Sequence, residues 1–534
     1  MARIVKRPAA FMAATAIALT VVFSTPAHAQ VTAFRQAIAE NASQDDAIAA
    51  FYRARDFQGL WSGTDELAQA RRNALLGAFD SASLHGLPQA QFDPQALIAR
   101  MQVADTVYER GQMDVELTKL FLDYARDLQS GILVPSRVSS DIKRQAPVRD
   151  RLETLTAFAE ADPTTFIRDL APQTGEYARL MRAKIDLEHR ILAGGWGETV
   201  RASDTLRPGD TGATVVELRN RLIKMGYMGR SVSSTYDEQL VEAVSKFQAE
   251  HGLLVDGVAG GGTLTELNVS PEERLQSVIV AMERERWLNR ERGERHVWVN
   301  QADFTAKIID DGIVTFETRA VIGANTSDRR SPEFSDTMDH MVINPSWYVP
   351  RSIVVGEYLP QLQQNPAAAG QLQIINASGQ VMSRNQDFSQ FTASTFPYSM
   401  KQPPGPGNAL GTVKFMFPNR YNIYLHDTPS RSLFARESRA FSHGCIRLQD
   451  PHDFAYALLA VQTDDPQGFF QSKLRSGVEQ RVNLDTPIPV HLDYRTAFTN
   501  ADGTLQFRRD VYGRDRQIWN ALSAAGVAGA GVQG

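Results

Sequence analysis

Residues 424–448 read YLHDTPSRSLFARESRAFSHGCIRL and contain Cys445, the only cysteine among the 534 residues. Two histidines precede it: His443 by two positions and His426 by nineteen. Alternating apolar residues before His426 predict a strand that ends there, and a polar, Arg-rich loop separates this strand from the cysteine. Two strand ends joined by a loop can bring His426 and Cys445 together. The segment therefore predicts a β-rich domain with its thiol beside a strand end.

The strand pattern continues on both sides of this segment. Short β-branched and aromatic runs such as HVWVN, IVTFETRAVIG, HMVINPSWYV and PIPVHLDYRTAF lie between turn residues. They predict a mostly antiparallel β-sandwich or small barrel, within a catalytic domain over 271–515. Residues 350–402 turn helical and then polar, which we interpret as an inserted helical and loop cap, or lid; the alternative is a loop without function.

The region before this domain has a helical pattern. In 30–200, apolar residues such as Leu117, Phe121 and Leu128 follow the three-and-four spacing of one buried stripe, which predicts a helical scaffold domain. Residues 205–270 contain three short amphipathic helices, enough for one small core. The fold class predicted for the whole chain is therefore multidomain α+β.

The two ends of the chain differ from these domains. Residues 1–29 combine a basic start, a short apolar run and the small-residue site Ala27-His28-Ala29, which predicts a secretory signal peptide and export; the alternative is an uncleaved anchor. We find no other apolar run long enough to cross a bilayer. Residues 516–534 are expected to be a tail whose Gly/Ala-rich part, after Ala521, is disordered. The near balance of 56 basic and 61 acidic residues suggests no nucleic-acid partner.

An exported chain with one cysteine has no internal disulfide, so Cys445 is either buried or used. A thiolate is the reactive form, and a neighbouring imidazole can take the proton; both His426 and His443 are candidates. Gly444 would let backbone N–H groups approach a developing oxyanion, and Arg447 could bind a substrate carboxylate. The alternatives are an inert buried thiol and a zinc ligand.

Several motifs resemble those of known families. His426 followed by the SHGCIR run from Ser442 to Arg447 resembles the signature of the L,D-transpeptidase family. Residues 404–415 and 343–350 resemble blocks of its larger Gram-negative members, and the Phe51-Tyr52 and Leu60-Trp61 pairs resemble their scaffold domain. Residues 206–264 resemble the three-helix peptidoglycan-binding domain.

The resemblance implies a function and a role for each site residue. A periplasmic enzyme of this family would form 3→3 cross-links in peptidoglycan through a cysteine thioester and release D-alanine from tetrapeptide stems. Cys445 would be the nucleophile and His426 the base, oriented by the backbone carbonyl of Asp427. The remaining implied roles are an oxyanion hole or loop formed by His443 and Gly444, and substrate binding by Arg447, Ser442, Tyr424 and Trp347.

The resemblance implies no metal and no organic cofactor. The implied partners are donor and acceptor peptidoglycan stems, with carbapenems as covalent inhibitors of Cys445. Two alternatives remain open: an L,D-carboxypeptidase, in which water resolves the thioester, and a wall-binding scaffold without enzymatic activity.

Overall fold

The computed structural model describes residues 26–529. Most of the predicted signal peptide, 1–25, lies outside the described residues, and its last residues begin helix α1 (Pro26–Ala42). No helix of the described part is both long enough and apolar enough to cross a membrane. The chain divides into two compact units, and the helical region expected over 30–200 contributes to both.

Among the described residues, the first unit is helical and comprises 26–74, Gln95–Leu122 and Asp150–Pro163. Its helices are α1, α2 (Asp46–Ala54), most of α4 (Pro94–Gln102), α7 (Arg151–Glu160) and the first parts of α3 (Glu66–Asp80) and α5 (Val107–Ser130). The predicted stripe on α5 is confirmed, because Leu117, Phe121 and Leu128 are all buried.

A fully buried carboxylate organises this unit. Asp114 of α5 accepts hydrogen bonds from the backbone amides of Leu60, Trp61 and Ser62, at 2.9, 2.9 and 2.7 Å. The Tyr52 hydroxyl donates to the same carboxylate at 2.6 Å, and burial followed by the Asp114 charge raises the pKa of this phenol well above its usual value. Three of the motif residues, Tyr52, Leu60 and Trp61, thus bind one carboxylate.

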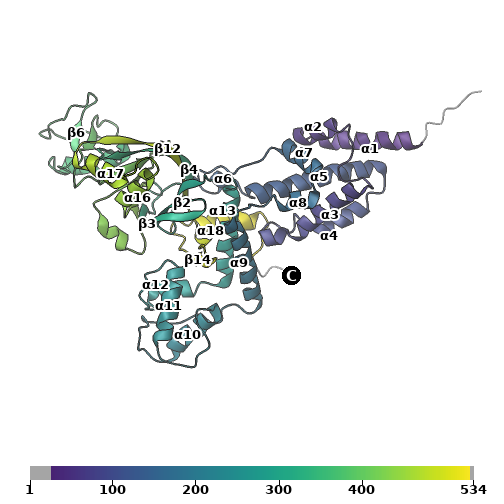
Figure 1. Cartoon of the computed structure of the whole chain (residues 1–534), viewed down its shortest axis with the longest axis horizontal. Coiled ribbons are helices and arrows are strands. Elements are labelled where there is room, and N and C mark those ends of the chain that lie inside the picture. Colours follow the sequence, from purple (N-terminus) through teal and green to yellow (C-terminus); the bar gives the residue numbers. More distant parts are fainter. Residues whose placement is uncertain (1–25, 530–534) are drawn as a thin grey trace, which may run out of the picture. The chain divides into compact units, whose positions relative to one another are not determined.

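The second unit contains a three-helix module made of α10 (Ala213–Met225), α11 (Glu238–Glu250) and α12 (Gly261–Leu267). Figure 1 shows these helices grouped together. Leu218, Leu240 and Phe247 are buried in one cluster, as the helical spacing predicts. The Gln248 side chain bridges α12 and the loop that precedes it. It accepts a hydrogen bond from the Gly257 amide in this loop at 2.9 Å and donates one to Thr263 of α12 at 3.1 Å.

The strands of the second unit form a nine-stranded sheet in the order β10-β3-β11-β9-β8-β4-β12-β1-β2. Its strands are β1 (Arg295–Asn300), β2 (Thr305–Asp310), β3 (Ile313–Gly323), β4 (Phe334–Ile343), β8 (Val413–Met416), β9 (Leu425–His426), β10 (Ala440–Ser442), β11 (Ile446–Leu448) and β12 (Gln480–Asp493). Most pairings are antiparallel, as predicted, and an additional β2–β3 pairing closes the sheet on itself like a small barrel. The fold class, multidomain α+β, is confirmed.

Helices and short elements complete the second unit. They are η1 (Ala82–His85), α6 (Pro135–Val138), α8 (Pro163–Arg168, from Thr164 on), α9 (Gly175–Leu192), α13 (Pro271–Trp287), η3 (Arg431–Ala435), α16 (Pro451–Leu459), α17 (Pro466–Arg475), β13 (Ala497–Thr499), β14 (Leu505–Phe507) and α18 (Arg514–Ala524). Helix α13 begins with a capping box between Ser270 and Glu273.

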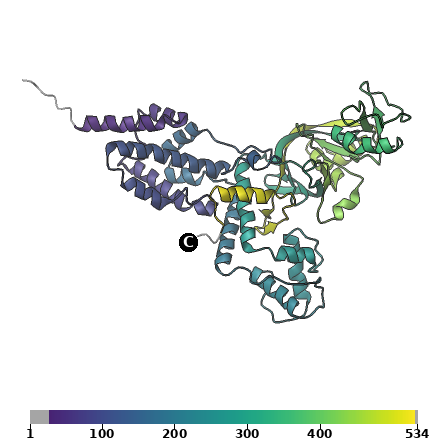
Figure 2. The ribbon, with the colours of Figure 1, turned by 180° about the vertical axis from the view of Figure 1, so that it is seen from behind.

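The expected tail over 516–534 differs from the structure. Helix α18 continues to Ala524 and buries Ile518 and Leu522, and Val527 beyond it is also buried. Both views place α18, in yellow, beside α13 (Figure 1, Figure 2). The Gly/Ala content suggested disorder, but the apolar residues 518, 522 and 527 give this segment a face to bury.

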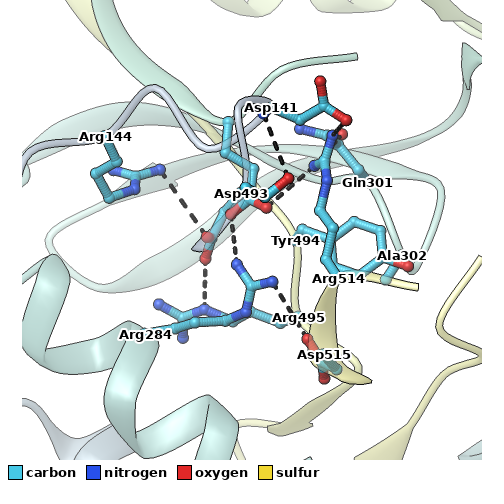
Figure 3. A network of polar contacts seen from close by, with 12 residues as sticks. Asp141, Arg144, Arg284, Gln301, Ala302, Asp493, Tyr494, Arg495, Arg514 and Asp515 are labelled. Carbon is cyan, nitrogen blue, oxygen red and sulfur yellow. Dashed lines mark hydrogen bonds and ion pairs between the residues drawn. The ribbon is translucent and has the colours of Figure 1, made fainter. Parts of the chain in front are cut away.

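A buried network of charges joins α13, β12 and α18 (Figure 3). Arg514 contacts the buried Glu333 at 3.0 Å, and Arg284 contacts Asp515 at 3.2 Å. Asp493 lies 2.5 Å from Arg495, whose charge holds the pKa of Asp493 well below its usual value against the opposing effect of burial. The network holds α18 to the sheet, because breaking one pair would leave a buried charge uncompensated.

The predicted insertion forms a small subdomain with its own core. A three-stranded sheet, β5 (Trp347–Tyr348), β7 (Ser399–Gln402) and β6 (Gln373–Ile375), packs with α14 (Arg351–Ile353), the π-helical turn η2 (Val354–Tyr358) and α15 (Leu359–Gln364). Its buried side chains include Ile353, Leu362 and Met400. More of this segment is regular structure than the polar sequence suggested.

Candidate functional site

Strand pairing brings the histidine, cysteine and arginine predicted to form the site to one face of the sheet. Strands β9 and β11 are parallel, with Leu425 opposite Ile446 and His426 opposite Arg447. Leu425 and Ile446 are buried in the core of the sheet. Because side chains alternate along strands, the neighbours of these two residues, Tyr424, His426, Cys445 and Arg447, point to the opposite face. Together with Lys414, which pairs with His426 from β8, they form the thiol face: Lys414, Tyr424, His426, Cys445 and Arg447.

The thiol of Cys445 is half-buried and protonated near neutral pH. Burial raises its pKa to about 11, although hydrogen bonds from Tyr424 and the charges of Arg447 and Lys414 act in the opposite direction. The thiol donates to the backbone carbonyl of Asn422, with sulfur and oxygen 3.5 Å apart. The Cys445 thiol is therefore held by a neutral acceptor in this state.

His426 is buried, and its Nδ1 contacts the backbone carbonyl of Asp427. A carbonyl only accepts, so Nδ1 carries the hydrogen and Nε2 keeps its lone pair. Burial, followed by the Arg447 charge, lowers the pKa of this imidazole to about 3. The ring is thus neutral, and among the described residues its Nε2 has no hydrogen-bond partner.

The expected contact between an imidazole and the thiol is not present in this state. Within residues 26–529, no hydrogen bond joins the Cys445 sulfur to His426 or His443. The site rests as a neutral thiol and a neutral imidazole, rather than the expected thiolate–imidazolium pair, because burial penalises the charged form of each.

His443 has a different position from His426. It is exposed, and its Nε2 lies 2.6 Å from Oε1 of Glu357 in η2 of the insertion. The same oxygen lies 2.6 Å from Nη2 of Arg329. His443 therefore joins the cysteine loop to the insertion, whereas His426 belongs to the thiol face.

The loop before Cys445 is fixed by hydroxyl groups. The buried Ser442 hydroxyl donates to the Cys445 carbonyl at 2.6 Å and accepts from the Gly444 amide at 3.0 Å. Ser331 donates to the Gly444 carbonyl at 2.6 Å, and Gly444 has φ +116°, which side chains rarely adopt. The Gly444 amide expected to serve an oxyanion hole is thus already bonded. Among the described residues, the Cys445 amide has no acceptor.

Asp427 orients the histidine through its backbone, and its side chain fixes the neighbouring turn. Its carboxylate accepts from the Thr412 amide and hydroxyl, both at 2.8 Å, and from Arg431 at 2.7 Å. Gly411 has φ +61°, and a Cβ there would lie 2.3 Å from the Asp427 carboxyl carbon. The glycine before Thr412 is therefore required by close packing.

The two remaining predicted substrate residues differ in position. Arg447 lies on the thiol face, and its buried Nε has no hydrogen-bond partner in the described part of the chain. Trp347 lies on β5 of the insertion, half-buried, with its ring 6.4 Å from that of Tyr358. The structure places Tyr424 and Arg447 on the thiol face, and the Ser442 hydroxyl binds the backbone carbonyl of Cys445. Among the described residues, no hydrogen bond joins Trp347 to Cys445.

Sequence reasoning assigned no role to Lys414 or Glu357. Lys414 is half-buried on a short strand, between the core positions Val413 and Phe415. A lysine between two apolar strand residues could have indicated a functional position from the sequence. Glu357 carried no signal, since only the folded insertion brings it to His443. Within residues 26–529, no group of three or more His, Cys, Asp or Glu residues is arranged to hold a metal ion.

Models of three domain families match successive parts of the chain. A scaffold domain matches residues 46–183, a peptidoglycan binding domain matches 211–267, and an L,D-transpeptidase catalytic domain matches 294–467. The last match contains every residue of the thiol face. The class defined by the fold and the domain match is thus a β-rich catalytic domain that carries a cysteine on one face of its sheet. Residues 294–467 thus resemble the catalytic domain of L,D-transpeptidases, and they follow regions that match scaffold and peptidoglycan-binding domains.

Individual relatives cover parts of the chain. A Haemophilus influenzae protein curated as a candidate L,D-transpeptidase is 31% identical over 228 residues, which are 42% of this chain and 45% of the relative. The N-acetylmuramoyl-L-alanine amidase CwlM of Mycobacterium tuberculosis is 40% identical over 74 residues, 12% of this chain and 18% of that protein. The chain thus spans less than half the length of these curated relatives.

Solved L,D-transpeptidase structures give a distant likeness. The protein from Stackebrandtia nassauensis is 14% identical, with a TM-score of 0.22, and the alignment covers 58% of this chain and all of that one. The protein from Xylanimonas cellulosilytica is 15% identical, with a TM-score of 0.17, covering 55% of this chain and 98% of that one.

Proposed function

We propose that the chain is an L,D-transpeptidase that makes 3→3 cross-links in peptidoglycan through a thioester on Cys445. The observation that carries the proposal is the thiol face, where a thiol, a neutral imidazole with a free Nε2 and two cations share one side of paired strands. A nucleophile, an oriented base and positive charge are the parts that acyl transfer needs.

The acylation step starts from a neutral pair. A donor stem would displace the thiol from the Asn422 carbonyl, and His426 Nε2 would take the proton as sulfur attacks the carbonyl carbon of the third stem residue. The Cys445 amide would donate to the oxyanion. The carbon–nitrogen bond to D-alanine would then break, and the imidazolium would return the proton to the leaving amine. Since burial disfavours the imidazolium, proton transfer and attack would occur together.

In the second step the acceptor amine is the nucleophile and the Cys445 sulfur is the leaving group. The side-chain amine of a diaminopimelate residue on an acceptor stem would attack the thioester while His426 takes its proton. The carbon–sulfur bond would break, and the thiolate would regain the proton. Arg447, with its unpartnered Nε, would bind a stem carboxylate, and the charges of Arg447 and Lys414 would stabilise the transient thiolate.

The proposal includes the location and the inhibitors. Peptidoglycan lies outside the cytoplasm, so the chain would act in the periplasm after removal of its signal peptide. The insertion, joined to the cysteine loop through Glu357 and His443, would cover bound stems as a lid. A carbapenem, as a strained acyl donor, would acylate Cys445.

Incubation of the mature chain with purified disaccharide tetrapeptides tests the proposal. Mass spectrometry should detect 3→3 dimers, free D-alanine and a transient acyl adduct, and all three should disappear in Cys445→Ala. Tripeptide products without dimers would instead identify an L,D-carboxypeptidase. Absence of any adduct, with a carbapenem as well as with stems, would identify a non-enzymatic wall-binding protein.

A further inference from the structure

A second cleft, separate from the thiol face, lies between the three-helix module and the β-rich domain. Its volume is about 750 Å³. One wall is the loop from His251 to Val255, after α11. The opposite wall includes parts of β2 and β3 and residues 435–439, which lead directly into β10 and the cysteine loop.

The cleft has an excess of positive charge. Six basic residues line it against three acidic ones, Asp303, Glu317 and Glu437. Each of these carboxylates already has a basic partner: Asp303 binds Arg508, Glu317 lies 3.2 Å from Lys307, and Glu437 contacts Arg509. Three guanidinium groups are left over.

The three remaining cations are Arg319, Arg436 and Arg439. Among the described residues none of them forms an ion pair with a carboxylate; Arg319 and Arg439 donate instead to backbone carbonyls, such as those of Phe434 at 3.3 Å and Ala320 at 3.2 Å. Burial, followed by the neighbouring Arg319 charge, lowers the pKa of Arg439 to about 10. Like charges held together repel, and an anion in the cleft would remove this cost.

Aromatic rings hold some of these groups in defined positions. The Arg439 guanidinium lies 5.1 Å from the Phe304 ring centroid, and Arg436 lies 5.1 Å from that of Phe441. Such stacking restricts a guanidinium. The N–H groups of Arg439 already donate to backbone carbonyls, so this residue would attract a carboxylate through its charge. Among the described residues the Arg436 guanidinium donates no hydrogen bond, and its N–H edge could bind a carboxylate directly.

We propose that this cleft binds the carboxylate groups of a peptidoglycan stem peptide, at a site separate from the one that reacts with Cys445. The volume suits a short peptide rather than a folded protein. One wall belongs to the region that matches the peptidoglycan binding domain, and the other leads into the cysteine loop. A stem bound here would hold its glycan strand close to the catalytic domain. The inference relies on the proposed function for its class of ligand.

The test measures binding, so it does not depend on turnover. The full chain carrying Cys445→Ala is titrated with soluble disaccharide tetrapeptide. Arg319→Glu with Arg436→Glu, both at exposed positions, should weaken binding about tenfold or more, because two charge-assisted contacts become repulsions. The matched control is Arg182→Glu with Arg475→Glu, two exposed cations outside the cleft, and it should bind as the parent does. Unfolding temperatures establish that all variants are folded.

Three results would overturn the proposal. The first is that the cleft variant and the control bind the stem with equal affinity. The second is that the cleft variant loses as much affinity for a stem with amidated carboxylates as for the unmodified stem. The third is cleft-dependent binding of a poly-glutamate peptide but not of the stem, which would identify a site for acidic protein segments. If Cys445 proved unreactive while stem binding still required Arg319 and Arg436, the transpeptidase proposal would fail and this one would stand.

Discussion

Glu357 and His443 are 86 residues apart in sequence, and their side chains lie 2.6 Å from each other. Through this pair the insertion contacts the loop that carries Cys445, and the same carboxylate also binds Arg329. His443 is one of the two candidate bases in the sequence, and its Nε2 is therefore already bound to a carboxylate of the insertion. This relationship separates the roles of the two histidines and provides a direct way to test the insertion.

Glu357→Gln should loosen the insertion without altering the thiol. Glu357 and its partners are about one-third exposed, so losing its charge should cost about 1 kcal/mol, or roughly a fivefold rise in KM for stem peptides. Hydrogen exchange over 347–402 should increase. Asp387→Asn, an exposed carboxylate of the same insertion that bonds only Ser389, is the control. An unchanged KM together with faster exchange would show that the insertion does not handle substrate.

His426→Ala should reduce acylation of Cys445 far more than His443→Ala. His426 has the free Nε2 on the thiol face, and a general base contributes about 10²- to 10⁴-fold. His443→Ala removes only the contact to Glu357 and should cost less than about tenfold. Single-turnover mass spectrometry of the acyl-enzyme measures both rates. Equal losses, or the reverse order, would assign the base to His443.

Alkylation of Cys445 by iodoacetamide should accelerate with pH. Because its pKa is raised to about 11, the thiolate fraction should rise about tenfold per pH unit from pH 7 to 10. A plateau below pH 8 would instead indicate a preformed thiolate–imidazolium pair.

Lys414→Met should slow this alkylation at pH 8. The lysine charge favours the thiolate and lowers the thiol pKa, so its removal raises that pKa, and the rate should fall about three- to tenfold. Lys246→Met, which removes an exposed charge on α11 of the three-helix module, should leave the rate unchanged. If both variants reacted alike, Lys414 would have no electrostatic influence on the thiol.

Asp114→Ala should destabilise the helical unit alone. It would leave the buried amides of Leu60 and Trp61 without an acceptor, at a cost of about 3 kcal/mol or more, while the Tyr52 hydroxyl keeps the backbone carbonyl of residue 114 and Thr118 as partners. Calorimetry should resolve an earlier first transition, while alkylation of Cys445 stays unchanged. Asp105→Ala, at an exposed position of the same unit, should have little effect. A parallel loss of thiol reactivity would mean that the two units unfold together.

Local patterns were sufficient to predict several features of the chain. The strand alternation before His426, the helix stripes of the module and the end of β9 at His426 depend on neighbouring residues, and the structure has them where they were expected. The motif Ser442 to Arg447 indicated the resemblance to L,D-transpeptidases for the same reason. The apolar spacing of Ile518 and Leu522 was also in the sequence, but Gly/Ala content hid it.

The amino-acid sequence by itself determined which groups are available: one thiol, two neighbouring imidazoles, the strands that carry them and the motifs that resemble those of L,D-transpeptidases. Only the tertiary structure decided which imidazole shares a face with the thiol, that Glu357 reaches His443, and that thiol and imidazole rest uncharged. The physical reason is that desolvation and long-range pairing depend on what surrounds a group in space, and residues far apart in the chain provide those surroundings.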